Sequence, residues 1–316
     1  MSFNIPVLLI TFNKLEQTRK LIESLKVIQP KKIYVSNDGP RFGVDRDEVV
    51  YEVRSLIEKE INWDCDVIKI YHSQNLGCAK CVPYAINYLF QNEELGIILE
   101  EDCIPSPDFF EYQKEMLLHY KDDMRVMAIC GYKPLKCIEG PSNSYYFSRY
   151  VSFWGWGTWK RAWAKFDFEM DELDTLVNSG LLRRNFPTYI EYSANKIAFT
   201  QTKEGKNSSW GYRWAYSMII NRGVAIYPYC NTIVNIGFSI ETATHTTSKL
   251  GVGLSDSYQD MNFPLIHPNN ILINRVAELI YAKKTWRSRV IRFNTIQLLK
   301  SAKIYGILRY IWKLKN

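Results

Sequence analysis

The sequence predicts an α/β protein whose central sheet is mainly parallel, Rossmann-like and flanked by helices. Its first hundred residues alternate short, β-rich runs with longer helical patterns, which is the rhythm of βαβ units. The β-rich runs are apolar on both faces, as expected for parallel strands buried between helices. With 316 residues, of which 47% are hydrophobic, the chain can bury a large core, and this excludes a disordered protein.

The elements follow from these patterns in chain order. We expect strands at Val7–Thr11, Ile33–Ser36, Val67–Tyr71 and Ile97–Glu100, with helices between them at Leu15–Leu25, Asp47–Glu60 and Ala79–Phe90. Further on we expect a helix at Phe109–His119, a strand at Val126–Cys130, a helix at Trp210–Asn221 and a strand at Val224–Tyr227. Open parallel sheets bind ligands beyond the carboxyl ends of their strands. The loops after the strands are therefore the first places to look for a site.

The basic charge of the chain is concentrated near its C-terminal end. The formal net charge is +7, yet residues 283–316 contain ten Lys or Arg and no acid, so the remainder is slightly acidic. We predict a domain at 1–250, with halves that meet at about residue 105, and an extension at 251–316. Because apolar residues alternate with the cations, the extension is predicted to contain a basic amphipathic helix.

This helix predicts peripheral binding to an anionic membrane surface. A helix packed on the body with its cations in water is the alternative, and nucleic acid is not an expected partner because no recognition motif accompanies the charge. The seven scattered cysteines suit free thiols in a reducing compartment. No apolar run approaches the roughly 20 residues of a membrane span, and Ile5–Ile10 lacks the features of a signal peptide. We expect a cytoplasmic protein, peripheral on the inner face of the membrane if the tail binds lipid.

Three consecutive acids, Glu100, Glu101 and Asp102, follow the fourth predicted strand. Acids at the end of a buried strand are costly unless a cation or hydrogen-bond donors offset them. Mg²⁺ and Mn²⁺ are suitable cations because they prefer one or two carboxylates together with phosphate oxygens and water. The cluster predicts a metal site that bridges a bound diphosphate, with an acidic surface turn as the alternative.

The segment LEEDCIPSPDFFEY, residues 99–112, resembles the acidic segment of the N-acetylglucosaminyltransferase I-like family, which has the GT-A fold. The family attaches the first branching N-acetylglucosamine to N-glycan cores. The resemblance implies that Asp102 binds Mn²⁺ (or Mg²⁺). It also implies that Glu101 contacts a nucleotide-diphosphate sugar in the catalytic centre. We predict Glu100 as a further donor-binding residue, with a supporting position behind Glu101 as the alternative. It further implies that residues 1–105 bind the nucleotide and 106–250 the acceptor.

Other loops resemble donor-binding parts of the same family. Thr11, Phe12 and Asn13 follow the first strand, Asp38 and Gly39 follow the second, and Asn75 follows the third. The resemblance implies that Asp38 holds the base, and a carboxylate can accept from a uracil or guanine N–H. A UDP-sugar is the expected donor. For Asp38-Gly39 alone, an ordinary turn is the alternative.

An aromatic segment, residues 150–163, offers flat rings that stack on sugars or pack in a core. We predict that Trp154 and Trp156 lie near the sugar and that Trp159 and Trp163 belong to the core. Trp210 and Tyr212 are further predicted acceptor-binding residues. The late segment 235–246 resembles a family loop that closes over metal and diphosphate, which implies that His245 is a second metal ligand.

The catalytic base departs from the family pattern. The family is inverting, and its proposed base is an Asp that follows a Trp, whereas Trp210 is followed by Gly211 here. Three explanations are open: the alignment with the family is shifted, another acid acts as the base, or the protein is a weak or inactive member. Glu241 is our predicted base, in preference to Glu204, because it lies four residues before His245.

The sequence thus predicts a metal-dependent, inverting glycosyltransferase that transfers a sugar to a hydroxyl of a glycan or lipid-linked acceptor. A nucleotidyltransferase is disfavoured because the loop Thr11–Lys14 contains no glycine, and those enzymes carry a Gly-rich phosphate loop there. A non-catalytic sugar-binding or scaffold protein is the other alternative, and Gly211 keeps it open.

Overall fold

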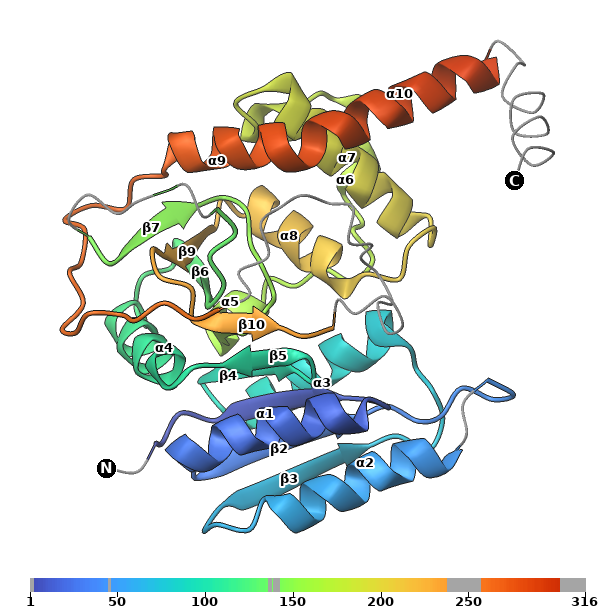
Figure 1. Cartoon of the computed structure of the whole chain (residues 1–316). Helices are drawn as coiled ribbons and strands as arrows, with labels where there is room; N and C mark the ends of the chain where they lie inside the picture. Colours follow the sequence, from blue (N-terminus) through green and yellow to red (C-terminus); the bar gives the residue numbers. More distant parts are fainter. Residues whose placement is uncertain (1–2, 45–46, 136–137, 139–142, 238–256, 302–316) are drawn as a thin grey trace.

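A computed structural model of the chain describes residues 3–44, 47–135, 138, 143–237 and 257–301. Its centre is an eight-stranded sheet in the order β3-β2-β1-β4-β8-β6-β9-β7 (Figure 1). These strands are β1 (Val7–Thr11), β2 (Lys32–Asn37), β3 (Asp66–Tyr71), β4 (Leu95–Glu100), β6 (Val126–Cys130), β7 (Tyr145–Ser148), β8 (Trp156–Trp159) and β9 (Val224–Pro228). Only β8 and β7 run against the other six. The predicted α/β fold with a mainly parallel sheet is confirmed.

Helices flank the sheet in two groups. On one side α1 (Leu15–Ile28) packs against α2 (Asp47–Glu60) and α4 (Pro107–His119). On the other, α3 (Cys78–Asn92) packs against α5 (Lys160–Trp163) and α8 (Trp210–Ile220). The right-handed rule for crossovers accounts for the division, because α1 and α2 lead one way along the sheet and α3 leads back. In the view of Figure 1, α1 and α2 lie in front of the sheet.

The strand order changes direction between β1 and β4. The chain builds β1, β2 and β3 outward in one direction and then returns to place β4 on the other side of β1. Ligands of open α/β sheets bind at such a reversal, in the crevice expected beyond the carboxyl ends of the two central strands. The loop after β1 and the acids after β4 therefore meet at this crevice.

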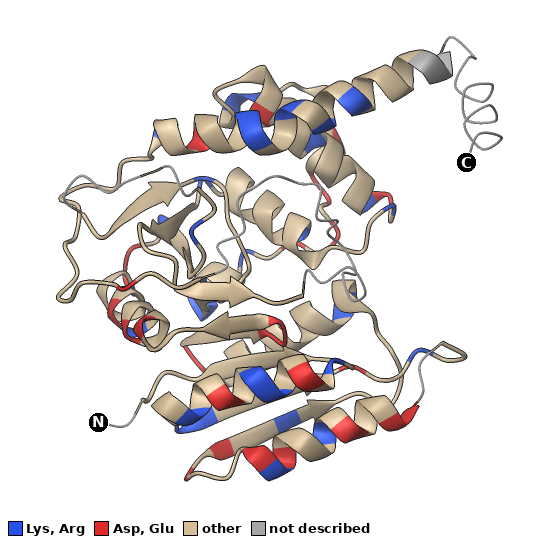
Figure 2. Ribbon diagram, in the orientation of Figure 1, with Lys and Arg blue, Asp and Glu red and all other residues tan. Residues whose placement is uncertain are grey.

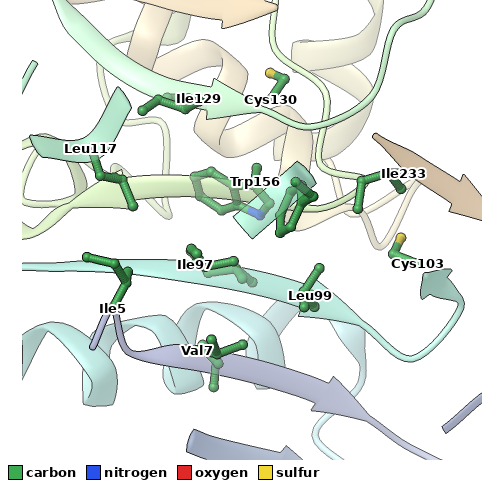
Figure 3. Close-up of a cluster of buried hydrophobic side chains, with 14 of the residues drawn as sticks. Ile5, Val7, Ile97, Leu99, Cys103, Leu117, Ile129, Cys130, Trp156 and Ile233 are labelled. Atoms are coloured by element: carbon green, nitrogen blue, oxygen red, sulfur yellow. The ribbon is translucent and has the colours of Figure 1, made fainter. Parts of the chain in front are cut away.

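The main core surrounds a tryptophan of the antiparallel strand β8. Figure 3 shows the Trp156 ring between Ile97 of β4 and Ile129 of β6. A second, smaller core lies under the C-terminal helices and contains Phe199, Tyr216 and Trp286. It joins α7 (Tyr189–Lys203) and α8 to α9 (Arg275–Tyr281), η2 (Ala282–Trp286) and α10 (Arg287–Ser301). The shorter α6 (Leu173–Asn178) and η1 (Leu182–Asn185) pack beside α7.

The predicted C-terminal helical extension is confirmed for its described part, which packs on the body. Trp286 and Val290 are buried in the second core, while Lys283 and Arg287 are exposed. Figure 2 shows Lys and Arg positions, in blue, along the ribbon of these helices at the top of the molecule. No helix in the described ranges has both the length and the apolar character required to cross a bilayer.

Candidate functional site

The site begins with Glu101, which ties the loop after β1 to the end of β4. The Phe12 N–H donates to the Glu101 carboxylate at 2.7 Å, and the Glu101 N–H donates to the Ile10 carbonyl at 2.9 Å. Burial raises the pKa of Glu101 to about 7 in spite of the Phe12 hydrogen bond. Glu101 therefore positions the loop after β1, and a direct contact of its carboxylate with a donor would compete with this bond.

Asp102 forms an ion pair that the sequence analysis missed. The Lys14 ammonium lies 2.9 Å from Oδ2 of Asp102 and 4.0 Å from Oε1 of Glu101. Burial alone would lower the pKa of Lys14, but the charge and hydrogen bond of Asp102 raise it above its ordinary value. The Lys14 ammonium offsets part of the negative charge of the acidic cluster. The available signal was a lysine in the β1 loop, next to the strand that carries the acids.

The described start of the predicted late segment, residues 235–237, lies against Asp102. The strand β10 (Ile233–Asn235) pairs with β5 (Cys103–Pro105), directly after the acids. The Asn235 side-chain amide donates to Oδ1 of Asp102 at 3.3 Å, and the Ile236 N–H donates to the Asp102 carbonyl at 2.8 Å. Two predicted residues of the following loop, Glu241 and His245, lie outside the described residues.

Asp38 has all but one of its acceptor positions engaged. Its carboxylate accepts hydrogen bonds at 2.9 Å from the backbone N–H groups of Gly39, Leu76 and Gly77. Asn75 donates from its side chain to the Gly39 carbonyl at 2.8 Å. A carboxylate has about four acceptor positions, so roughly one is left for a base. The predicted residues after β2 and β3 do come together, and these hydrogen bonds fix the two loops to each other.

We predict that Asp38→Asn lowers the free energy of unfolding by about 1–3 kcal/mol, because an amide NH₂ would face a buried backbone N–H and leave it without an acceptor. Urea unfolding measures the change. Asp174→Asn removes a 72% exposed carboxylate paired with Lys203 and is the control, with an expected change within about 0.5 kcal/mol. Equal losses in the two variants would contradict the loop-anchoring role.

Thr11 belongs to the framework of the sheet, which corrects its prediction as a donor-binding residue. Its hydroxyl donates to the Ser36 carbonyl and accepts from the Asn37 side chain, both at 3.0 Å, and the residue is 3% exposed. The other two predicted residues, Phe12 and Asn13, are half-buried in the loop.

A pocket of about 490 Å³ opens beside the acids. Glu100 lies on its wall, together with the predicted acceptor residues Trp154, Trp210 and Tyr212. Burial, followed by the charge of Asp102, raises the pKa of Glu100 to about 8. Among the described residues that line the pocket, Glu100 is the one carboxylate. The acids at the end of β4 therefore lie in two places: Asp102 lies beside Lys14, and Glu100 lines the pocket.

Trp156 corrects the prediction for the aromatic segment. It is 0% exposed and packs against Phe153, Trp210 and Trp214, so its ring cannot stack on a sugar. The glycines at 155 and 157 suggested a loop, whereas β8 begins at Trp156 and lies inside the sheet. The assignment of Trp159 and Trp163 to the core is confirmed by exposures of 2% and 4%.

Gly211 lies on the pocket wall at the start of α8, where the resemblance implied an Asp. A Cβ built on Gly211 would lie 2.5 Å from a ring carbon of Phe153. The aromatic ring thus fills the position that an acidic side chain would need. The packing of Phe153 therefore leaves no room for the expected catalytic Asp at position 211.

The side chains at the acidic cluster suit a metal ion only if phosphate oxygens supply further ligands. Among the described residues, no group of three or more His, Cys, Asp or Glu is placed to hold an ion. Asp102, with a side chain 16% exposed, is a single carboxylate, which suffices for Mg²⁺ or Mn²⁺ when phosphate oxygens and water complete the shell. The site therefore fits a metal that arrives with a diphosphate.

No protein-family model and no curated protein sequence matches the chain. Among solved structures it resembles the mannosyltransferase PcManGT from Pyrobaculum calidifontis, in complex with GDP-Man and Mn²⁺, at 15% identity and TM-score 0.35. That match covers 50% of this chain and 45% of that one. It also resembles a UDP-glucose pyrophosphorylase complexed with UDP-glucose, at 7% identity and TM-score 0.38, over 73% and 92% of the two chains. Mouse xyloside xylosyltransferase 1 matches at 12% identity and TM-score 0.35, over 68% and 81%.

Proposed function

We propose that this chain is an inverting glycosyltransferase of GT-A type that uses a nucleotide-diphosphate sugar. The observation that carries the proposal is the acidic cluster at the switch point between β1 and β4, which adjoins an aromatic pocket of about 490 Å³. Diphosphate recognition requires positive charge at the crevice, and sugar recognition requires flat rings beside it. Lys14 and Trp154 supply these two features.

The donor would lie across the crevice. The nucleotide would rest between the loop after β1 and the Asp38 loop, with its diphosphate towards Lys14 and Asp102. The Lys14 ammonium can then leave Asp102 for the diphosphate, which offsets the negative charge of the bound donor. Mn²⁺ or Mg²⁺ held by Asp102, with His245 as the proposed second ligand, would stabilise the charge of the departing diphosphate.

The acceptor would occupy the pocket beside the sugar of the donor. The half-buried ring of Trp154 offers an apolar face for the acceptor, and Tyr212 offers a hydroxyl. The ring of Trp210 is 3% exposed and packs on Phe153 and Trp156, so this predicted acceptor residue supports the pocket wall from the core. The carboxyl group of Glu100 faces the same pocket, where it would bind hydroxyls of the donor sugar. A bound acceptor would displace water and hold its hydroxyl in line with the anomeric carbon.

Glu241 is our proposed base, and we predict that Glu241→Gln lowers turnover by at least about a hundredfold while the donor Kd stays unchanged. Gly237 contacts Asp102, and the four residues from there to Glu241 span at most about 14 Å. Turnover and donor Kd are measured in parallel, with Glu204→Gln as the control because that glutamate was the other acid considered. Unchanged turnover in Glu241→Gln would rule out this assignment.

One observation favours a second function. Because Phe153 fills the position beside Gly211, a protein that binds nucleotide sugars without turning them over is the alternative. A screen of UDP-, GDP-, ADP-, CDP- and dTDP-sugars for binding and for hydrolysis, with and without Mn²⁺, separates the two functions. Binding with Mn²⁺-dependent hydrolysis supports the transferase, and binding without hydrolysis supports a non-catalytic protein that binds nucleotide sugars. Failure of every donor to bind would overturn both.

A further inference from the structure

The pocket does not end at the aromatic residues but continues to the C-terminal helices. Besides Glu100 and the start of α8, its walls include Thr285, Trp286 and Arg289. Figure 1 shows β4 and the C-terminal helices at opposite sides of α8. The pocket therefore has an acidic end beside the donor crevice and a far end formed by η2 and α10.

Arg289 is the basic residue that the C-terminal helices turn towards this far end. Its guanidinium donates to the Tyr212 hydroxyl at 2.9 Å, and among the described residues no carboxylate pairs with it. Two nearby cations, Lys283 and Arg287, are exposed, whereas Arg289 is half-buried. A guanidinium held in a pocket without a counter-ion creates a site of positive potential, which favours an anionic ligand.

Two more hydrogen-bond donors of the far end have no acceptor. Nε of Arg149 and Oγ1 of Thr285 are buried and lack a hydrogen-bond partner among the described residues, and both residues line the pocket. Their elements lie side by side, because the rings of Tyr150 and Trp286 are 4.6 Å apart. Buried donors without acceptors cost free energy. A ligand with several acceptor oxygens would relieve this cost.

We propose that the acceptor substrate carries an oxyanion, a carboxylate or a phosphate, which binds at Arg289, Tyr212 and Arg149. This inference rests on the proposed glycosyltransferase function, which it deepens by naming the acceptor class. The oxyanion accepts from the Arg289 guanidinium, from the Tyr212 hydroxyl and from Nε of Arg149, whose Nη2 is already paired with Glu278. The sugar ring lies along the half-buried ring of Trp154, and its reacting hydroxyl points to the end of the pocket at Glu100.

Three small probes test the proposal: glucuronate, glucose 6-phosphate and glucose. Their binding is measured by calorimetry and by tryptophan fluorescence, since Trp154, Trp210 and Trp286 all line the pocket. We expect at least one of the two acids to bind the wild-type chain more tightly than glucose. Arg289→Gln should weaken that acid by about 10- to 100-fold, and Arg289→Lys should restore part of the loss. The control, Arg287→Gln, should change nothing because that arginine is exposed.

Preference for glucuronate assigns the site to a sugar acid, and preference for glucose 6-phosphate assigns it to a phosphorylated acceptor. Equal binding of glucose, no binding of either acid, or an unchanged affinity in Arg289→Gln would overturn the proposal. The donor screen is independent of this result. If donors bind and the acids do not, the acceptor class is wrong and the transferase stands. If glucuronate or glucose 6-phosphate binds and no nucleotide sugar does, the oxyanion site is supported and the glycosyltransferase function is ruled out.

Discussion

Asp102→Asn is expected to reduce sugar transfer by at least about a hundredfold, with the fold intact. The substitution preserves the shape of the side chain and removes the charge that pairs with Lys14 at 2.9 Å. In the proposed mechanism it also removes the carboxylate that would hold a metal at the diphosphate. Loss of one preorganised electrostatic partner typically lowers kcat by about 10²–10³-fold. The measurement is kcat with the best donor of the screen, at several Mn²⁺ concentrations.

A control for this variant lies six residues further along the chain. The carboxylate of Asp108 accepts a hydrogen bond from the Met261 N–H at 2.9 Å, and Asp108 does not line the pocket. Asp108→Asn should therefore keep kcat within about twofold, since it changes no group of the crevice. Thermal melts establish that both variants are folded. If Asp102→Asn were as active as Asp108→Asn, the assignment of Asp102 to the centre of the site would fail.

Glu278→Gln is expected to be the most destabilising of the substitutions considered, at about 3 kcal/mol. The carboxylate of Glu278 is 1% exposed and accepts from the Arg149 N–H at 2.7 Å and from the Arg149 guanidinium at 2.5 Å. Arg275 donates to the same carboxylate and, at 3.0 Å, to buried Glu191. Removal of one member of a buried ion network leaves its partners charged and unpaired, which costs about 3–5 kcal/mol. We take the lower value because the arginine side chains are 21% and 33% exposed.

Thermal and urea unfolding measure this loss, and an exposed ion pair supplies the comparison. Glu94 is paired with Lys160 at 3.0 Å, with a side chain that is 82% exposed. Glu94→Gln should change the free energy of unfolding by no more than about 1 kcal/mol, as is usual for pairs in water. If Glu278→Gln lowered the free energy of unfolding no more than Glu94→Gln does, the ion network would not stabilise the packing of α9.

The sequence was a good guide to the half of the chain in which local pattern and tertiary structure agree. The helix at Asp47–Glu60 and the strand at Val7–Thr11 have the predicted bounds. Parallel strands buried on both faces leave a strong apolar signal. The acids after Ile97–Glu100 were informative for the same reason, since a buried strand that ends in charges requires a compensating cation. The structure supplies Lys14 as one such cation.

Pattern was a poor guide where packing between distant segments decides the role of a residue. Trp156 has glycine on both sides, and glycine pairs are typical of loops. The ring is buried because β8 enters the sheet between β4 and β6, which no local pattern reveals. Arg289 was one of ten cations in the tail. Its contact with Tyr212 depends on the docking of α10 against α7 and α8, so sequence periodicity could not distinguish it.

The docking of the C-terminal helices has a consequence for how the protein becomes functional during synthesis. The acids at the end of β4 and Lys14 come from the first part of the chain, whereas β10, which lies against Asp102, follows much later. The far wall of the pocket requires Trp286 and Arg289, which leave the ribosome much later. In the proposed function, a chain cut before α9 would keep Lys14 and Asp102 but lack Arg289, which we propose binds the oxyanion of the acceptor. The two ends of the pocket are therefore completed at different times during synthesis, and the far end forms only when the last described helices dock.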